Sequence, residues 1–221
     1  MNDYDIETAE YLKHGLTLFQ AGLFGDSESE HLDKYCQLIA PNGVVVDMGA
    51  GVGGMGVGIQ NRCPLVTQVI NVTSSSVQEK IITDAGGIAV LSDYHSVPKI
   101  KSESVDFVMF NESFGYGDAK KLIAESARIL KPGGRLAIKD FAPMKPAAPV
   151  FLDAWEYVVY PVADIVCIAE SLELRCTLFT LPRAVKTVWD RFMRESNMKN
   201  WHGNTRHPLA VSLFIFEKQP A

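Results

Sequence analysis

A buried strand that runs directly into a glycine-rich turn is the feature that most constrains this fold. Residues 44–54 read VVVDMGAGVGG, so three valines and Asp47 are followed by glycines at positions 49, 51, 53 and 54. Glycine lets the chain turn sharply and leaves no Cβ between the backbone and a ligand. In open α/β sheets, ligands bind outside the carboxyl ends of the strands, where such turns lie. The segment predicts a ligand site immediately after Asp47.

Apolar β-branched runs alternate with segments of helical period along the rest of the chain. This alternation is typical of βαβ units and of a mostly parallel sheet. The predicted strands are 44–48, 67–72, 88–91, 105–110, 135–140, 172–180 and 209–216, and the predicted helices lie near 28–40, 54–62, 75–85, 118–131, 161–171 and 183–196. The predicted fold class is α/β, a Rossmann-like seven-stranded, mostly parallel sheet with helices on both faces.

One domain is expected over residues 1–221. A chain of 221 residues with 47% hydrophobic content suffices for one well-packed core, and no linker or internal repeat interrupts the alternation. Residues 1–26 and the proline-containing residues 141–160 stand outside the strand–helix pattern. We expect both stretches to cover the substrate and the cofactor.

The turn has the spacing GxGxxG at Gly49, Gly51 and Gly54, which is compatible with more than one cofactor. A dinucleotide would place its pyrophosphate on the turn and on the following helix N-terminus. Asp47 would repel that pyrophosphate, whereas it suits the ammonium and sulfonium groups of S-adenosylmethionine. A tight strand-to-helix connection without any ligand is the alternative interpretation of the turn.

Five motifs follow one another in an order that is known from one family. They are VDMGAGVGG at 46–54, VTSSSVQ at 72–78, LSDY at 91–94, DFVMFNES at 106–113 and LKPGGRL at 130–136. Over residues 10–140 or so, the chain resembles the class I S-adenosylmethionine-dependent methyltransferases. The resemblance implies S-adenosylmethionine as the cofactor and methyl transfer as the reaction.

The resemblance also implies which residues contact the cofactor. These are Asp47, Gly49, Ala50 and Gly51 at the methionine end, Thr73, Ser74 and Gln78 at the ribose, Asp93 and Tyr94 at the adenine, and Asn111 in the pocket wall through its backbone. Most of the superfamily has an acid at the end of the second strand, where this chain has Asn71. That departure is shared with a narrower group, which includes cyclopropane-fatty-acid synthases and C-methyltransferases of prenyl diphosphates, sterols and tocopherols.

Glu112 is the first candidate for a catalytic residue, because the narrower group often has a glutamate at this place. Methylation of a C=C bond leaves a carbocation, which a carboxylate such as Glu112 stabilises and from which it removes a proton. For an oxygen or nitrogen acceptor, Glu112 or His95 would act as the base. An exposed loop histidine without a catalytic role is the alternative interpretation of His95.

Composition and charge exclude several other classes. There are 21 basic and 26 acidic residues, a net charge of −5 and no Lys/Arg-rich run, which argues against nucleic acid as a partner. No apolar run is long enough for membrane insertion, and the four cysteines form no CxxC pair or Cys/His cluster, so we predict no metal. These features predict a cytoplasmic protein with reduced thiols.

The predicted function is S-adenosylmethionine-dependent methylation of a small, partly apolar molecule. The resemblance favours C-methylation of an isoprenoid-like alkene with Glu112 as the key residue. The alternatives are an O- or N-methyltransferase of a small metabolite and a non-catalytic S-adenosylmethionine-binding protein. A nicotinamide oxidoreductase is disfavoured by Asp47.

Overall fold

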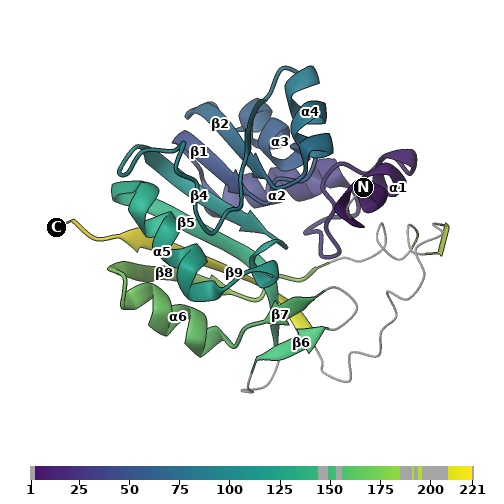
Figure 1. The fold of residues 1–221 in the computed structure, drawn as a ribbon. Helices are drawn as coiled ribbons and strands as arrows, with labels where there is room; N and C mark the ends of the chain where they lie inside the picture. The colour runs from purple at the N-terminus through teal and green to yellow at the C-terminus, as the bar shows by residue number, and fades with distance from the viewer. Residues whose placement is uncertain are drawn as a thin grey trace.

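A seven-stranded sheet forms the middle layer of the protein (Figure 1). The computed structural model describes residues 3–143, 149–152, 156–184, 191, 194–195 and 209–220. The strands of this sheet are β1 (Gly43–Met48), β2 (Val66–Thr73), β3 (Ile88–Leu91), β4 (Val105–Asn111), β5 (Leu130–Pro143), β8 (Leu174–Thr180) and β9 (Leu209–Lys218). Their order is β3-β2-β1-β4-β5-β9-β8, and β9 runs antiparallel to both of its neighbours. The predicted Rossmann-like sheet, mostly parallel and seven-stranded, is confirmed.

Helices cover both faces of the sheet, as predicted. They are α1 (Asp3–Lys13), α2 (Glu28–Ile39), α3 (Gly54–Arg62), α4 (Ser76–Asp84), α5 (Ala119–Ile129) and α6 (Val162–Glu170), with a short 3₁₀ helix η1 at Phe114–Tyr116. Figure 1 shows α2, α3 and α4 on one side of the sheet and α5 and α6 on the other. Each side has its own apolar core, one around Tyr35 and Phe107 and the other around Phe110 and Phe214.

Close packing between α3 and its neighbours depends on two glycines. A Cβ at Gly58 would lie 2.5 Å from the terminal methyl groups of Leu32 on α2, and a Cβ at Gly56 would lie 2.3 Å from Asn71 Oδ1. Each glycine costs about 1 kcal/mol of helix propensity relative to alanine. The close approach of α2 and of β2 is the physical reason for glycine at both positions.

The structure differs from the sequence prediction at several elements. It adds the helix α1 and a hairpin of β6 (Val150–Leu152) and β7 (Tyr157–Val159). Helix α1 is anchored by hydrogen bonds from Ser75 Oγ to Asp5 and from Gln78 Nε2 to Thr8. Because polar side chains make these contacts, the helix lacks the regular apolar pattern by which helices are recognised in a sequence. Residues 181–184 are not helical, and most of the helix predicted at 183–196 lies outside the described residues.

The described residues include no helix that is long and apolar enough to span a bilayer. The same part of the chain holds no group of three or more His, Cys, Asp or Glu side chains placed to bind a metal ion.

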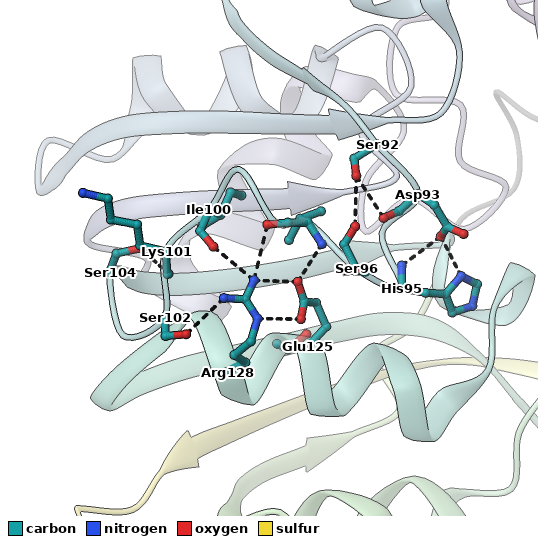
Figure 2. Close-up of polar contacts among 12 residues, drawn as sticks. Ser92, Asp93, His95, Ser96, Ile100, Lys101, Ser102, Ser104, Glu125 and Arg128 are labelled. Carbon is teal, nitrogen blue, oxygen red and sulfur yellow. Dashed lines mark hydrogen bonds and ion pairs between the residues drawn. The ribbon is translucent and has the colours of Figure 1, made fainter.

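A partly buried polar network fixes the loop between β3 and β4 (Figure 2). Arg128 binds both carboxylate oxygens of Glu125 at 2.7 Å and donates to the carbonyls of Val97 and Ile100 at 3.3 and 3.0 Å. Glu125 in turn accepts the Val97 amide at 2.6 Å. Partial burial opposes ionisation, but the hydrogen bonds from Arg128 and Val97 hold the pKa of Glu125 below its usual range. The network therefore holds in place the loop that carries Asp93 and His95 at its start.

We predict that Arg128→Met lowers the free energy of unfolding by about 1–3 kcal/mol, because it leaves Glu125 and two loop carbonyls without their donor. The stabilisation from Glu125 is present above the unfolded-state pKa of a glutamate and is lost as the pH falls. The difference between the variant and the parent protein should therefore shrink in acid. Urea denaturation at pH 7 and pH 4 measures it. Lys80→Met, which breaks the exposed pair with Asp84, is the control and should have almost no effect.

Candidate active site

A cavity of about 340 Å³ lies at the carboxyl ends of β1, β2 and β4, a volume within the usual range of ligand pockets. It brings together ten of the twelve residues that the sequence predicted for the site. They are Gly49, Gly51, Thr73, Ser74, Gln78, Asp93, Tyr94, His95, Asn111 and Glu112. The other two, Asp47 and Ala50, are buried beside it.

The glycine-rich turn accommodates protein segments as well as a ligand. Gly49 and Gly51 have positive φ angles of 78° and 54°, a conformation that favours glycine. A Cβ at Gly49 would lie 2.6 Å from Ser113 Cβ, and one at Gly51 would lie 3.1 Å from the Phe19 ring. A Cβ at Gly54 would meet the Thr17 carbonyl oxygen at 2.5 Å. The GxGxxG spacing therefore lets both the end of β4 and the N-terminal segment approach the turn.

Asp47 is a buried carboxylate near the carboxyl end of β1, immediately before the glycine-rich turn. It is 2% exposed, and its Oδ1 accepts a weak hydrogen bond of 3.5 Å from Asn111 Nδ2. Burial raises the pKa of Asp47 to about 7, which the hydrogen bond from Asn111 partly offsets. Among the described residues, Asn111 Oδ1 finds no hydrogen-bond partner. An acceptor atom without a partner and a carboxylate without a cation fit a ligand that brings a positively charged donor.

The polar residues after β2 are tied to each other and to α1. Thr73 Oγ1 donates to Gln78 Oε1 at 2.6 Å, and Gln78 Nε2 donates to Thr8 Oγ1 at 2.9 Å. Ser74 lines the cavity beside them. Asn71 is absent from the cavity wall, because its side chain lies against Gly56 and donates to the Ile88 carbonyl at 3.0 Å.

Asp93, Tyr94 and His95 form the opposite wall. Asp93 Oδ1 contacts His95 Nδ1 at 2.6 Å and the His95 amide at 2.9 Å, as Figure 2 shows. His95 Nε2 accepts the Asp118 amide at 3.0 Å. Both ring nitrogens of His95 thus have protein partners, in an arrangement that requires the neutral tautomer with its proton on Nδ1. Tyr94 reaches across the cavity to donate to the Ser113 carbonyl at 3.1 Å.

Glu112 joins the sheet to the N-terminal segment. Its carboxylate accepts the amides of Ala21 and Gly22 at 2.7 and 3.0 Å and pairs with the ammonium of Lys139 at 2.5 Å. The Glu112 side chain is 5% exposed, and Lys139 is fully buried. Glu112 lines the cavity, but three donors already bind its two oxygens.

The strap, which we define as residues 16–24, closes the cavity together with α1. Tyr11 from α1 and Phe19 from the strap stack at 4.2 Å between ring centroids, and both line the cavity with Glu7, Thr8 and Leu18. Side chains from residues 1–26 thus line the cavity, and their role as a cover over substrate and cofactor stays a prediction. The sequence did not point to Glu7, Thr8 or Lys139, since none of them belongs to a motif or to an apolar period. Ser113 ends the motif at 106–113, but the motif assigned it no role.

The second expected cover, residues 141–160, is described in part. Tyr157 from β7 donates to Asp140, which also accepts the amides of Phe114 and Phe141 at 3.0 and 2.6 Å. Burial raises the pKa of Asp140 to about 7, although the hydrogen bond from Tyr157 acts to lower it. These contacts fix η1, from which Tyr116 lines the cavity.

Comparison with known proteins finds similarity to methyltransferases over part of the chain. Residues 46–138 match the family model of a methyltransferase domain. A curated relative, 2-phytyl-1,4-beta-naphthoquinone methyltransferase of Arabidopsis thaliana, is 26% identical over 141 residues, which are 58% of this chain and 54% of the relative. The chain therefore spans about half the length of that relative.

Solved structures agree on the fold over nearly the whole chain. The [4+2]-cyclase SpnF aligns with a TM-score of 0.80 and 14% identity over 99% of this chain and 94% of the cyclase. A second structure is geranyl diphosphate C-methyltransferase from Streptomyces coelicolor A3(2), solved with Mg²⁺, geranyl diphosphate and S-adenosyl-L-homocysteine. It aligns with a TM-score of 0.71 and 16% identity over 98% of this chain and 99% of that enzyme.

The domain match and the curated relative are both methyltransferases, as the motifs predicted. Residues 46–138 match the domain, and the fold is one that solved methyltransferases share. S-adenosylmethionine, the cofactor predicted from the motifs, is bound in one of these solved structures.

We predict that Asp47→Asn stabilises the unliganded protein, and more so at pH 8 than at pH 5. Because burial raises the pKa of Asp47 to about 7, the folded state keeps a proton that the unfolded state loses near pH 4. The stability of the parent protein therefore falls as the pH rises from about 4 to about 7 and is level above that. The advantage of the variant should grow by about 2–3 kcal/mol between pH 5 and pH 8 in chemical denaturation. An equal advantage at both pH values would contradict the assignment.

Proposed function

We propose that this protein transfers a methyl group from S-adenosylmethionine to a small, partly apolar acceptor. The observation that carries the proposal is that buried Asp47 and the unpartnered Oδ1 atom of its neighbour Asn111 lie together behind the glycine-rich turn. This pair offers a negative charge and an acceptor atom, which a pyrophosphate would not use and an ammonium group would.

The cofactor is proposed to lie along the ten cavity residues that the sequence predicted, with Asp47 and Ala50 supporting it. Asp47, Gly49, Ala50 and Gly51 would hold the methionine end, with the backbone of Asn111 beside it. Thr73, Ser74 and Gln78 would face the ribose, and Asp93 and Tyr94 the adenine. The hydrogen bonds from Gln78 to α1 and from His95 to Asp93 support this assignment, because they hold both walls in place before a ligand enters.

When bound, S-adenosylmethionine supplies an electrophilic methyl group on a sulfonium ion. The chain has to align the acceptor with that methyl group and to exclude water. Tyr11, Leu18 and Phe19 support the second task, because they place apolar surface over the cavity. Tyr116 presents an aromatic ring from the opposite side, which suits an acceptor that is partly apolar.

C-methylation of an isoprenoid-like alkene is our first proposal for the reaction. A carbocation forms when the C=C bond attacks the methyl group, and Glu112 lines the cavity where it would stabilise that charge or accept the proton. Tyr11 and Tyr116 line the cavity with Glu112, and their rings would add attraction for the cation. Because Lys139 partly neutralises Glu112, the position of the Glu112 carboxylate matters for this reaction as much as its charge does.

O- or N-methylation with His95 as the base is the second possibility. It requires His95 to accept a proton from the acceptor, and its Nε2 lone pair already binds the Asp118 amide. The reaction would need that hydrogen bond to break first. The third possibility is a protein that binds S-adenosylmethionine without methyl transfer. Two observations favour it: the polar atoms of Glu112 and His95 already have protein partners, and the chain shares its fold with a protein named as a cyclase.

The cofactor assignment is tested by ligand-induced stabilisation. S-adenosylmethionine and S-adenosylhomocysteine at about 100 times their Kd should add about 2.7 kcal/mol to the free energy of unfolding, and NAD should add nothing. Asp47→Asn should abolish most of this gain. Asp106→Asn is the matched control, since Asp106 is paired with Lys131 at the opposite end of the sheet. Stabilisation by NAD, or equal gains in both variants, would overturn the assignment.

The catalytic assignment is tested by turnover with a panel of prenyl diphosphates, sterols and phenols. At saturating S-adenosylmethionine, Glu112→Gln should lower kcat about 100-fold or more, as removal of a general base or of a charge at the reacting centre does. His95→Gln should leave most of kcat in place. A larger loss of kcat in His95→Gln than in Glu112→Gln would favour O- or N-methylation. Cofactor binding without any product would favour the non-catalytic hypothesis.

A further inference from the structure

Lys139 is a fully buried lysine for which neither the fold nor the cofactor accounts. It lies near the carboxyl end of β5, in register with Asn111 of β4. Its ammonium contacts Glu112 Oε1 at 2.5 Å and Gln20 Oε1 at 2.8 Å, with the Phe24 ring 5.6 Å away. A buried ammonium is costly to desolvate unless its hydrogen bonds and a counter-charge compensate it. Two of these contacts, those with Gln20 and Phe24, are made with the strap.

Glu112 is held to Lys139 by its backbone as well as by its side chain. The Glu112 amide donates to the Lys139 carbonyl at 2.8 Å, and its φ angle of 55° is one that non-glycine residues rarely adopt. This backbone conformation persists only where the surroundings impose it. Pinned in this way, the carboxylate faces the amides of Ala21 and Gly22.

The strap fits closely onto this pair. A Cβ at Gly22 would lie 2.3 Å from Val211 Cγ2 and 3.3 Å from Glu112 Oε1, so the chain reaches the carboxylate because residue 22 is glycine. At the other end of the strap, Glu28 accepts the amides of Thr17 and Leu18 at 2.9 and 3.0 Å. Between the two carboxylates, the strap carries Leu18 and Phe19 into the cavity wall.

We propose that Lys139 is a positioning residue for methyl transfer: it orients Glu112 so that the carboxylate holds the strap over the cofactor pocket. Lys139 is absent from the cavity lining, so it acts through Glu112 and Gln20 and not on the ligand itself. Without its ammonium, the Glu112 carboxylate is a buried anion whose remaining donors are two amides, and it has to turn towards water. The amides of Ala21 and Gly22 then lose their acceptor and the strap loosens. This inference rests on the proposed function, since the strap matters for catalysis only if the cofactor lies beneath it.

Three variants test the proposal. Lys139→Met removes the ammonium, and the double variant Glu112→Met/Lys139→Met removes both charges, so that no unpaired ion destabilises the fold. Lys131→Met is the matched control, because Lys131 lies on the same strand and pairs with Asp106 at 2.7 Å, far from the strap. Amide hydrogen exchange of residues 16–24 in the unliganded protein reports the strap directly. The Kd for S-adenosylhomocysteine and the KM for S-adenosylmethionine report its effect on the site.

Both Lys139 variants should lose exchange protection in the strap while β1 and β4 keep theirs. The Kd and the KM should rise about tenfold, or about 1.4 kcal/mol, and Lys131→Met should change neither. Strap protection and affinity equal to the parent protein in the double variant would overturn the proposal. Loss of protection throughout the sheet in that variant would also overturn it, because the pair would then support the whole fold. If the parent protein binds no S-adenosylhomocysteine, the proposed function fails, and the exchange of the strap still decides the role of Lys139.

Discussion

The site depends on one close approach, at the turn that follows β1. The end of β4 comes to Gly49 and the strap to Gly54 at distances that leave no room for a Cβ, and the strap also comes close to Gly51. Three segments far apart in the sequence meet here: the turn after β1, the end of β4 and the strap. The turn therefore fixes the positions of all three around the cavity. A side chain at any of these glycines would displace protein as well as ligand.

Buried charged side chains at the carboxyl edge of the sheet determine which ligand charge suits the site. Parallel strands in register bring Asp47, Asn111 and Lys139 to the same edge, away from water. Glu112 and Lys139 neutralise each other, and Asp140 is bound by Tyr157 and two amides. Asp47 has the weak contact with Asn111, and burial raises its pKa to about 7. The edge therefore keeps one carboxylate whose charge a cationic ligand would stabilise.

Polar contacts and apolar packing together hold the cover on the site. Glu28 binds one end of the strap, Glu112 binds the other, and α1 is attached through Ser75 and Gln78. Each of these hydrogen bonds contributes little net free energy, since water offers the same partners when it opens. Most apolar side chains of the strap are buried in the core that also contains Tyr35 and Phe107. The apolar packing therefore supplies most of the attachment, and the polar contacts fix where the strap lies over the cavity.

The amino-acid sequence by itself determined the sheet, its helices and most of the cavity lining, because these follow from local rules. Apolar period sets strands and helices, and a glycine-rich turn after a buried strand marks the ligand edge of an α/β sheet. The sequence did not reveal α1, whose polar anchors lie about seventy residues away on α4. Nor did it reveal Lys139, which looks like an ordinary lysine near the end of a strand. Only the tertiary structure decided that Lys139 is buried and that Glu112 faces the strap, because contacts between residues 21, 112 and 139 exist only once the sheet has brought them together.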